Sequence, residues 1–126
     1  MGAAVNTLLV IDDNEILLDA IQDYFLKRNY TVYASTNGLD ALKLLEIHKE
    51  EIDLIITDLI MPNISGVGLI SISKKKYPSI PVIAITGWGE HPEALAAEAN
   101  ADKIIEKPIK LNKLEDVIKE MLTDRK

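Results

Sequence analysis

The chain of 126 residues is acidic, with a formal net charge of −6; 48% of its residues are hydrophobic and 27% are charged. This composition suits one soluble domain over residues 1–126, with a core from about residue 7 to 122. The chain has no cysteine, which excludes disulfides and thiol nucleophiles, and it has no basic stripe for nucleic acid. Its apolar runs are too short to span a membrane and no signal peptide is recognised, so we expect a cytoplasmic protein.

Strand-like and helix-like segments alternate five times along the chain. Short apolar, β-branched runs predict strands at residues 7–11, 30–34, 54–58, 82–85 and 103–106. Apolar residues at helical spacing predict helices near residues 15–28, 38–48, 66–77, 92–99 and 111–122. Such alternation implies an α/β fold: a five-stranded parallel sheet of order 2-1-3-4-5, doubly wound with five helices.

Polar residues mark the ends of several predicted helices. Asp13 or Asn14 can cap the first helix, and Asn29 and Asn100 can adopt the left-handed conformation that ends a helix. Asn37-Gly38 is a turn signal. The apolar residues expected to line the inner face are Ile16, Leu17, Ala20, Ile21, Tyr24 and Phe25 in the first helix, Leu39, Leu42 and Leu45 in the second, and Leu69, Ile70 and Ile72 in the third.

Side chains suited to chemistry occur where four of the predicted strands end. Asp12 and Asp13 follow the first strand, Asp58 ends the third, Thr86 follows the fourth and Lys107 follows the fifth. These four strands are contiguous in the order 2-1-3-4-5, and ligands bind at the carboxyl edge of such sheets. Each of these residues also has a structural explanation when it is taken alone. The two aspartates could equally be helix caps, the threonine could simply be a strand-end residue, and the lysine could be a solvated side chain. Their joint pattern favours one common site.

The chemistry of this set indicates phosphoryl transfer. Three neighbouring carboxylates repel one another unless a cation neutralises them. With oxygen ligands only, Mg²⁺ is the natural cation. A carboxylate, Mg²⁺, a lysine and a hydroxyl together are typical of a phosphoryl-transfer site. Asp58, at the centre of the edge, would be the nucleophile.

These features resemble the receiver domain of the two-component response regulator family. The motifs that carry the resemblance are Asp12-Asp13, the D-x-x-M-P run from Asp58 to Pro62 with Gly66 beyond it, Thr86, and Lys107-Pro108. The resemblance extends over nearly the whole chain, from about Thr7 to Leu122. It implies the flavodoxin-like receiver fold and a phosphorylation-dependent signalling switch, not a metabolic enzyme.

The resemblance also implies a role for each phosphoryl-binding residue. Asp58 would accept a phosphoryl group from the phosphohistidine of a histidine kinase or phosphotransfer protein. Lys107 would hold a phosphoryl oxygen, and Thr86 would move toward the group and signal its presence. The protein would thus be a phosphoprotein that catalyses its own phosphorylation and slow dephosphorylation.

A Mg²⁺ site is a further implication of the resemblance. Asp13, Asp58 and the backbone carbonyl of Ile60 would ligate the ion, and Asp12 would act through water. The Lys107-Pro108 peptide bond is expected to be cis, which only X-Pro bonds adopt readily.

Two features concern how the switch is read. The family usually carries an aromatic residue three positions before the lysine, and here that residue is Ile104, so the usual coupling to Thr86 cannot occur. The short, alanine-rich helix at residues 92–99, the strand at 103–106 and the last helix are expected to form the partner face, with a homodimer on phosphorylation as a further expectation. The sequence does not name the downstream effector.

Three alternatives compete with this interpretation. A Mg²⁺-dependent phosphohydrolase of the haloacid dehalogenase type needs a second Asp two residues after the nucleophile, where this chain has Ile60. A flavin-binding flavodoxin would need a phosphate loop after the first strand, and the acidic set there would repel the flavin phosphate. A receiver-like domain that only binds partners would not need the intact acidic set.

Overall fold

The computed structural model describes residues 6–59, 66–87 and 100–123. Its strands are β1 (Thr7–Ile11), β2 (Thr31–Ser35), β3 (Leu54–Asp58), β4 (Val82–Thr86) and β5 (Lys103–Glu106). They form one parallel sheet of order β2-β1-β3-β4-β5, as the sequence predicts. The strand after Asn29 is displaced by one residue from the predicted range 30–34, because the Tyr30 N–H donates to the Phe25 carbonyl at 3.0 Å and so belongs to the turn after α1.

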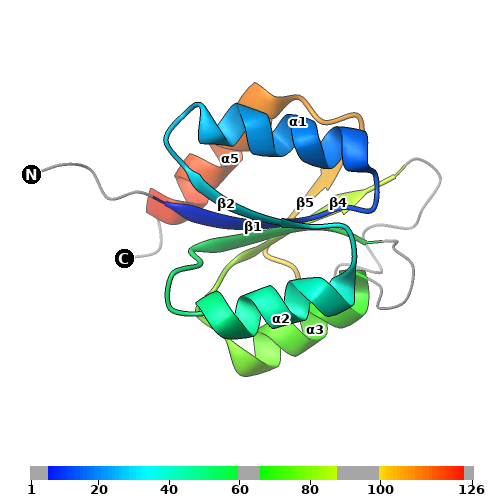
Figure 1. Ribbon diagram of the computed structural model, residues 1–126, viewed down its shortest axis with the longest axis vertical. Helices are drawn as coiled ribbons and strands as arrows, with labels where there is room; N and C mark the ends of the chain where they lie inside the picture. Colours follow the sequence, from blue (N-terminus) through cyan, green and yellow to red (C-terminus); the bar gives the residue numbers. More distant parts are fainter. Residues whose placement is uncertain (1–5, 60–65, 88–99, 124–126) are drawn as a thin grey trace, which may run out of the picture.

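Helices cover both faces of this sheet. The described helices are α1 (Glu15–Leu26), α2 (Gly38–His48), α3 (Gly66–Lys76) and α5 (Leu111–Thr123). Figure 1 shows α1 and α5 on one face and α2 and α3 on the other. The predicted helix at residues 92–99 lies outside the described residues, so the described part contains four of the five predicted helices.

The core is divided in two by the sheet. Strands β1, β3 and β4 are buried at every position, which explains their unbroken apolar sequences. Successive residues of a strand face opposite sides, so Leu9 and Ile55 pack with the α2–α3 layer while Leu8 and Ile56 pack with the α1–α5 layer. The three central strands are therefore fixed from both sides, and so are their ends.

Asparagine side chains and backbones define several helix ends. Asn14 caps α1 by accepting a hydrogen bond from the Leu17 N–H at 3.2 Å. Asn29, just beyond α1, has a φ value of 70°, and Asn100 has a φ value of 65°, so the predicted left-handed conformations are confirmed. The helix that Asn100 is predicted to end lies outside the described residues. Asn37 caps α2 directly, and its side chain accepts from the Asp40 N–H at 2.8 Å. The Asn37-Gly38 signal is thus the start of a helix and not a separate turn.

Several apolar residues predicted to face inward are exposed. Ile16 is 84% exposed, Leu39 51% and Ile72 36%, and Ala20 is exposed as well. The predicted stripes were too wide: α1 buries Leu18, Ile21 and Phe25, α2 buries Ala41 and Leu45, and α3 buries Leu69, Ile70 and Ser73. Helical spacing gives the period of a buried face, but the rotation of the helix depends on what it packs against. Among the described helices, none has the length and apolar character needed to cross a membrane.

Candidate functional site

Three aspartates meet at the carboxyl edge of the sheet. Ile11 pairs with Thr57 and Asp58 pairs with Ile85, so β1, β3 and β4 end at nearly the same level. Asp12 follows β1 and is fully buried, Asp58 ends β3 and is 4% exposed, and Asp13 is exposed. One carboxylate oxygen from each lies within 4.8 Å of the others. The side chains predicted to converge do lie together.

Lys107 brings a positive charge into this cluster. Its Nζ lies 3.2 Å from Oδ2 of Asp58 and 3.6 Å from Oδ2 of Asp12. Its backbone N–H donates to the Thr86 carbonyl at 2.8 Å, and its peptide bond to Pro108 is cis, as the sequence analysis expects. The end of β5 is therefore held against β4 while the lysine side chain reaches β1 and β3.

The environment of Asp12 shifts the pKa of its carboxyl group upward. Burial raises its pKa, and the nearby charges of Asp58 and Asp13 raise it further. A hydrogen bond from the Asn14 N–H to Oδ1, at 2.9 Å, and the charge of Lys107 act in the opposite direction. The other oxygen, Oδ2, is buried and has no hydrogen-bond partner among the described residues. The site therefore has a carboxylate that the protein itself satisfies incompletely.

Lys107 stays protonated in this environment. Burial lowers the pKa of its ammonium group, but the charges of Asp12 and Asp58 outweigh burial and raise the pKa above its usual value. Among the described residues, the cluster thus combines three carboxyl groups with one ammonium group, which contacts Asp12 and Asp58. Oxygen-only donors with an excess of negative charge are the ligand set that a hard divalent cation such as Mg²⁺ prefers, so the residues present fit that ion.

Thr86 ends β4 beside the aspartates. It is fully buried, and its Oγ1 has no hydrogen-bond partner within residues 6–59, 66–87 and 100–123. A buried hydroxyl without a partner is costly, so its presence at this edge calls for a functional explanation. The sequence predicts such a role for Thr86. The remaining predicted ligand, the carbonyl of Ile60, lies outside the described residues.

Two further residues support Asp58 through contacts that the sequence does not predict. Thr57 is fully buried and donates from Oγ1 to the Asp58 carbonyl at 3.0 Å. Gly66 begins α3 against the same backbone: a Cβ there would lie 1.9 Å from the Asp58 carbonyl oxygen. Its N–H donates to the Leu59 carbonyl at 2.9 Å. Gly66 is needed because no side chain fits between α3 and the end of β3.

Comparison with known proteins decides the family. Residues 8–119 match the response regulator receiver domain family. The chain belongs to this family. This receiver domain is 32% identical to the response regulator SaeR of Staphylococcus aureus (strain USA300) over 120 residues, which are 94% of this chain and 51% of SaeR. It is 30% identical to the sensor kinase CckA of Brucella abortus (strain 2308) over 125 residues, which are 97% of this chain and 13% of CckA.

Solved structures share the receiver fold. A receiver domain from Clostridium thermocellum superposes with a TM-score of 0.88 at 28% identity, covering 94% of this chain and 95% of that one. A CheY-like receiver domain from Methanospirillum hungatei JF-1 gives a TM-score of 0.87 at 25% identity, covering 97% of both chains. The receiver domain described here is thus a signalling module and a phosphorylation-dependent switch, not a metabolic enzyme, and the haloacid dehalogenase alternative is not favoured. It spans about half the length of SaeR.

Proposed function

We propose that this receiver domain is switched by transfer of a phosphoryl group to Asp58. The observation that carries the proposal is the position of the Asp58 carboxylate, which ends a buried strand 3.2 Å from the Lys107 ammonium group and beside two further aspartates. The donor would be the phosphohistidine of a histidine kinase or phosphotransfer protein in the cytoplasm. Residues 1–126 would form one receiver domain, either alone or within a longer signalling protein.

The transfer follows from the charges around Asp58. A carboxylate oxygen of Asp58 attacks phosphorus, a P–O bond forms, the P–N bond to the donor imidazole breaks, and the imidazole leaves with that electron pair. The Lys107 ammonium group now contacts the Asp58 carboxylate, and it lies close enough to bind an oxygen of the phosphoryl group once that group is attached to Asp58. Catalysis at such a centre is mainly positioning and charge stabilisation, which a fixed lysine supplies. The protein thereby assists its own phosphorylation and, with water as the nucleophile, its slow dephosphorylation.

Mg²⁺ is the proposed cofactor. Asp13, Asp58 and the carbonyl of Ile60 would hold the ion, with Asp12 contributing through water. When bound, the ion supplies positive charge that offsets the phosphoryl oxygens. Within the described part of the chain, three carboxylates and one ammonium group meet at this edge, and this excess of negative charge supports the assignment.

Thr86 would detect the phosphoryl group. Its buried hydroxyl has no hydrogen-bond partner in the described part of the chain, and a phosphoryl oxygen is a strong acceptor. Ile104, opposite Ala84 and 39% exposed, cannot report that movement with an aromatic ring. The response would therefore reach the surface through the backbone between Thr86 and β5, where the Lys107 N–H bonds to the Thr86 carbonyl.

The surface of β5 and α5 is the proposed partner face, and a homodimer face after phosphorylation. A groove of about 230 Å³ lies there, with Ile105, Pro108, Leu114 and Val117 in its lining and Lys110 and Lys113 beside them. The predicted helix at residues 92–99 would complete this face but lies outside the described residues. If hydrogen exchange in β5 and α5 stayed unchanged on adding beryllofluoride, a phosphoryl mimic, this surface would not be the one that responds.

Phosphorylation itself is tested by intact-mass measurement. Incubation with a small phosphodonor and Mg²⁺ should add one phosphoryl group to the parent protein and none to Asp58→Asn. Asp23→Asn is the matched control, because Asp23 is an exposed aspartate on α1 whose partner is Lys27. Undiminished labelling of Asp58→Asn, or loss of labelling in Asp23→Asn, would contradict the assignment.

A further inference from the structure

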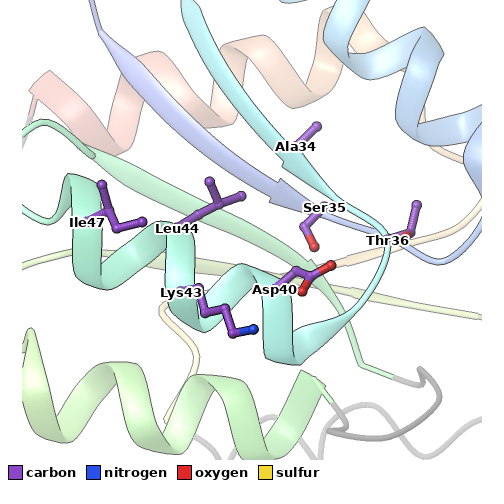
Figure 2. Close-up of a pocket in the computed structure, with 7 residues that line it drawn as sticks. All are labelled: Ala34, Ser35, Thr36, Asp40, Lys43, Leu44 and Ile47. Carbon is purple, nitrogen blue, oxygen red and sulfur yellow. The ribbon is translucent and has the colours of Figure 1, made fainter.

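Asp12 is held at two points by residues outside the acidic cluster. Its backbone N–H donates to the carbonyl of Ser35 at 3.2 Å, and its Oδ1 accepts from the Asn14 N–H at 2.9 Å. Figure 2 shows Ser35 at the end of β2, the strand that pairs with β1. The first contact fixes where the backbone of Asp12 lies, and the second fixes how its carboxylate is rotated.

The rotation of this carboxylate decides which of its oxygens enters the site. Because Oδ1 of Asp12 is occupied by the Asn14 N–H, the other oxygen, Oδ2, is the one that lies 3.6 Å from Lys107 Nζ. Oδ2 is buried and has no hydrogen-bond partner among the described residues. A buried oxygen without a partner is costly unless a ligand binds it, so this orientation favours binding of a cation at the edge of the sheet.

The Asn14 N–H is itself held in place by the start of α1. Asn14 is the N-cap of this helix, and its side-chain oxygen accepts from the Leu17 N–H at 3.2 Å. Its carbonyl accepts from the Leu18 N–H at 2.9 Å. The two hydrogen bonds hold Asn14 at a φ of −82° and a ψ of 103°, the extended conformation usual for an N-cap. One residue therefore begins α1 and also donates to the carboxylate of Asp12.

We infer that Asn14 is a positioning residue for the phosphoryl-transfer site. Its side chain caps α1, the cap holds its backbone N–H, and this N–H turns Oδ2 of Asp12 toward Lys107 and the cation. Asn14 acts through Asp12 and does not need to touch the ion. The inference rests on the proposed Mg²⁺ site, and it adds that the start of α1 sets the affinity of this site for the ion.

A cap that serves only its helix would affect stability and leave the site unchanged, and the chain offers such a cap for comparison. Asn37 caps α2 with the same atom, since its Oδ1 accepts from the Asp40 N–H at 2.8 Å. Figure 2 shows Asp40 in the first turn of that helix. Within the described ranges, the Asn37 side chain forms hydrogen bonds only with Asp40, so it does not contact the acidic cluster.

Calorimetric titration of the unphosphorylated protein with Mg²⁺, together with urea unfolding in EDTA, tests the inference. Asn14→Ala and Asn37→Ala should each lower the urea midpoint, because each removes a cap. Only Asn14→Ala should also raise the Mg²⁺ dissociation constant, by about threefold, since the N–H remains but is held less firmly. Asn14→Ser keeps both the cap and the N–H, so it should bind Mg²⁺ like the parent.

Asn14→Pro removes the hydrogen-bond donor itself. Proline has no N–H, and its fixed φ is close to the −82° of Asn14, so the backbone can keep its course. This variant should raise the Mg²⁺ dissociation constant by about tenfold, the lower end of the loss expected when the partner of a metal ligand is removed. Circular dichroism should show every variant folded, and if Asn14→Pro does not fold, the comparison of the alanine and serine variants decides.

The results that would overturn the inference differ from those that would overturn the proposed function. Equal affinity for Mg²⁺ in Asn14→Ala and the parent, an equal loss in Asn37→Ala, or a loss in Asn14→Ser would show that Asn14 is only a helix cap. A parent protein that binds Mg²⁺ but accepts no phosphoryl group at Asp58 would contradict the proposed function, and the order of the affinities would still decide the role of Asn14. A parent that binds no Mg²⁺ would overturn both.

Discussion

Two buried carboxyl groups of this protein have opposite environments. Glu115, at the contact between α1 and α5, is 5% exposed, and Asp12, at the carboxyl edge of the sheet, is fully buried. Glu115 Oε1 accepts from Arg28 Nε at 2.6 Å and from the Tyr24 hydroxyl at 3.1 Å, and these hydrogen bonds hold its pKa below the usual value. Burial and neighbouring carboxylates instead raise the pKa of Asp12.

The difference separates a carboxylate that holds the fold together from one that is available for chemistry. Around Glu115 the protein supplies the compensating groups itself, including Lys119 Nζ at 3.7 Å. Around Asp12 it supplies one hydrogen bond and a shared lysine, and it adds further negative charge. A site that is incompletely neutralised costs stability in the free protein and gains affinity for a cation.

The largest expected effect on stability comes from adding a side chain against the backbone at the carboxyl edge of the sheet. Gly66→Ala should lower the free energy of unfolding by about 3 kcal/mol, because its Cβ would lie 1.9 Å from the Asp58 carbonyl oxygen. Phosphoryl labelling of Asp58 should fall as well, since the end of β3 must move to make room for the Cβ. In a helix without this contact the same change stabilises by up to about 1 kcal/mol, so a stable, fully labelled Gly66→Ala variant would contradict the geometry.

Removing the charge of Glu115 should have the next largest effect. Glu115→Gln should lower the unfolding free energy at pH 7 by about 2 kcal/mol, less than for a fully buried pair because the Arg28 side chain is half exposed and can rehydrate. Because the folded pKa lies below the usual 4.5, this contribution is complete above pH 4.5 and is lost as the pH falls through the folded pKa. Urea unfolding of the parent and the variant should thus converge in acid.

A neighbouring glutamate provides the control for that experiment. Glu120 is on the same helix, but its side chain is 66% exposed and its oxygen lies 3.9 Å from Lys103 Nζ. Glu120→Gln should change stability by only a few tenths of a kcal/mol, roughly 0.3, at either pH. An equal loss in both variants would show that burial of Glu115 is not what matters.

Asp12→Asn should have the opposite sign to Glu115→Gln. In EDTA the amide relieves the buried negative charge while its oxygen still accepts from the Asn14 N–H, so stability should rise by about 1 kcal/mol. Millimolar Mg²⁺ should then stabilise the parent protein in thermal unfolding but not the variant. A destabilised Asp12→Asn variant in EDTA would mean that Lys107 already compensates this carboxylate.

Sequence patterns predict the carboxyl edge better than the helix contacts. Strand ends follow from β-branched runs and turn residues, and the sheet order then brings Asp12, Asp58 and Lys107 together. The contact of Tyr24 with Glu115 joins residues 91 positions apart and follows no local pattern. The Gly66 contact was likewise not foreseen, because it depends on how closely α3 approaches β3 in space. The roles of these site residues in phosphoryl transfer remain predictions for the variants above.

The smallest expected effect distinguishes two buried threonines at adjacent strand ends. Thr57 and Thr86 are both fully buried, but Thr57 donates to the Asp58 carbonyl while Thr86 Oγ1 has no partner within the described residues. Thr57→Val should therefore cost about 1 kcal/mol, the worth of one hydrogen bond, whereas Thr86→Val should be neutral or slightly stabilising.

The two threonine variants should rank in the opposite order for signalling: Thr86→Val should lose the response to phosphorylation, and Thr57→Val should keep it. Thr86→Val leaves Asp58 and Lys107 unchanged, so it should accept the phosphoryl group normally but lose the change in hydrogen exchange that beryllofluoride causes in β5. Thr57→Val should keep that change despite its lower stability. If Thr86→Val destabilised the protein as much as Thr57→Val, its hydroxyl would already have a partner in the free protein. The polar groups at the carboxyl edge would then have hydrogen-bond partners, as those around Glu115 do. The contrast between a satisfied and an unsatisfied region would not hold.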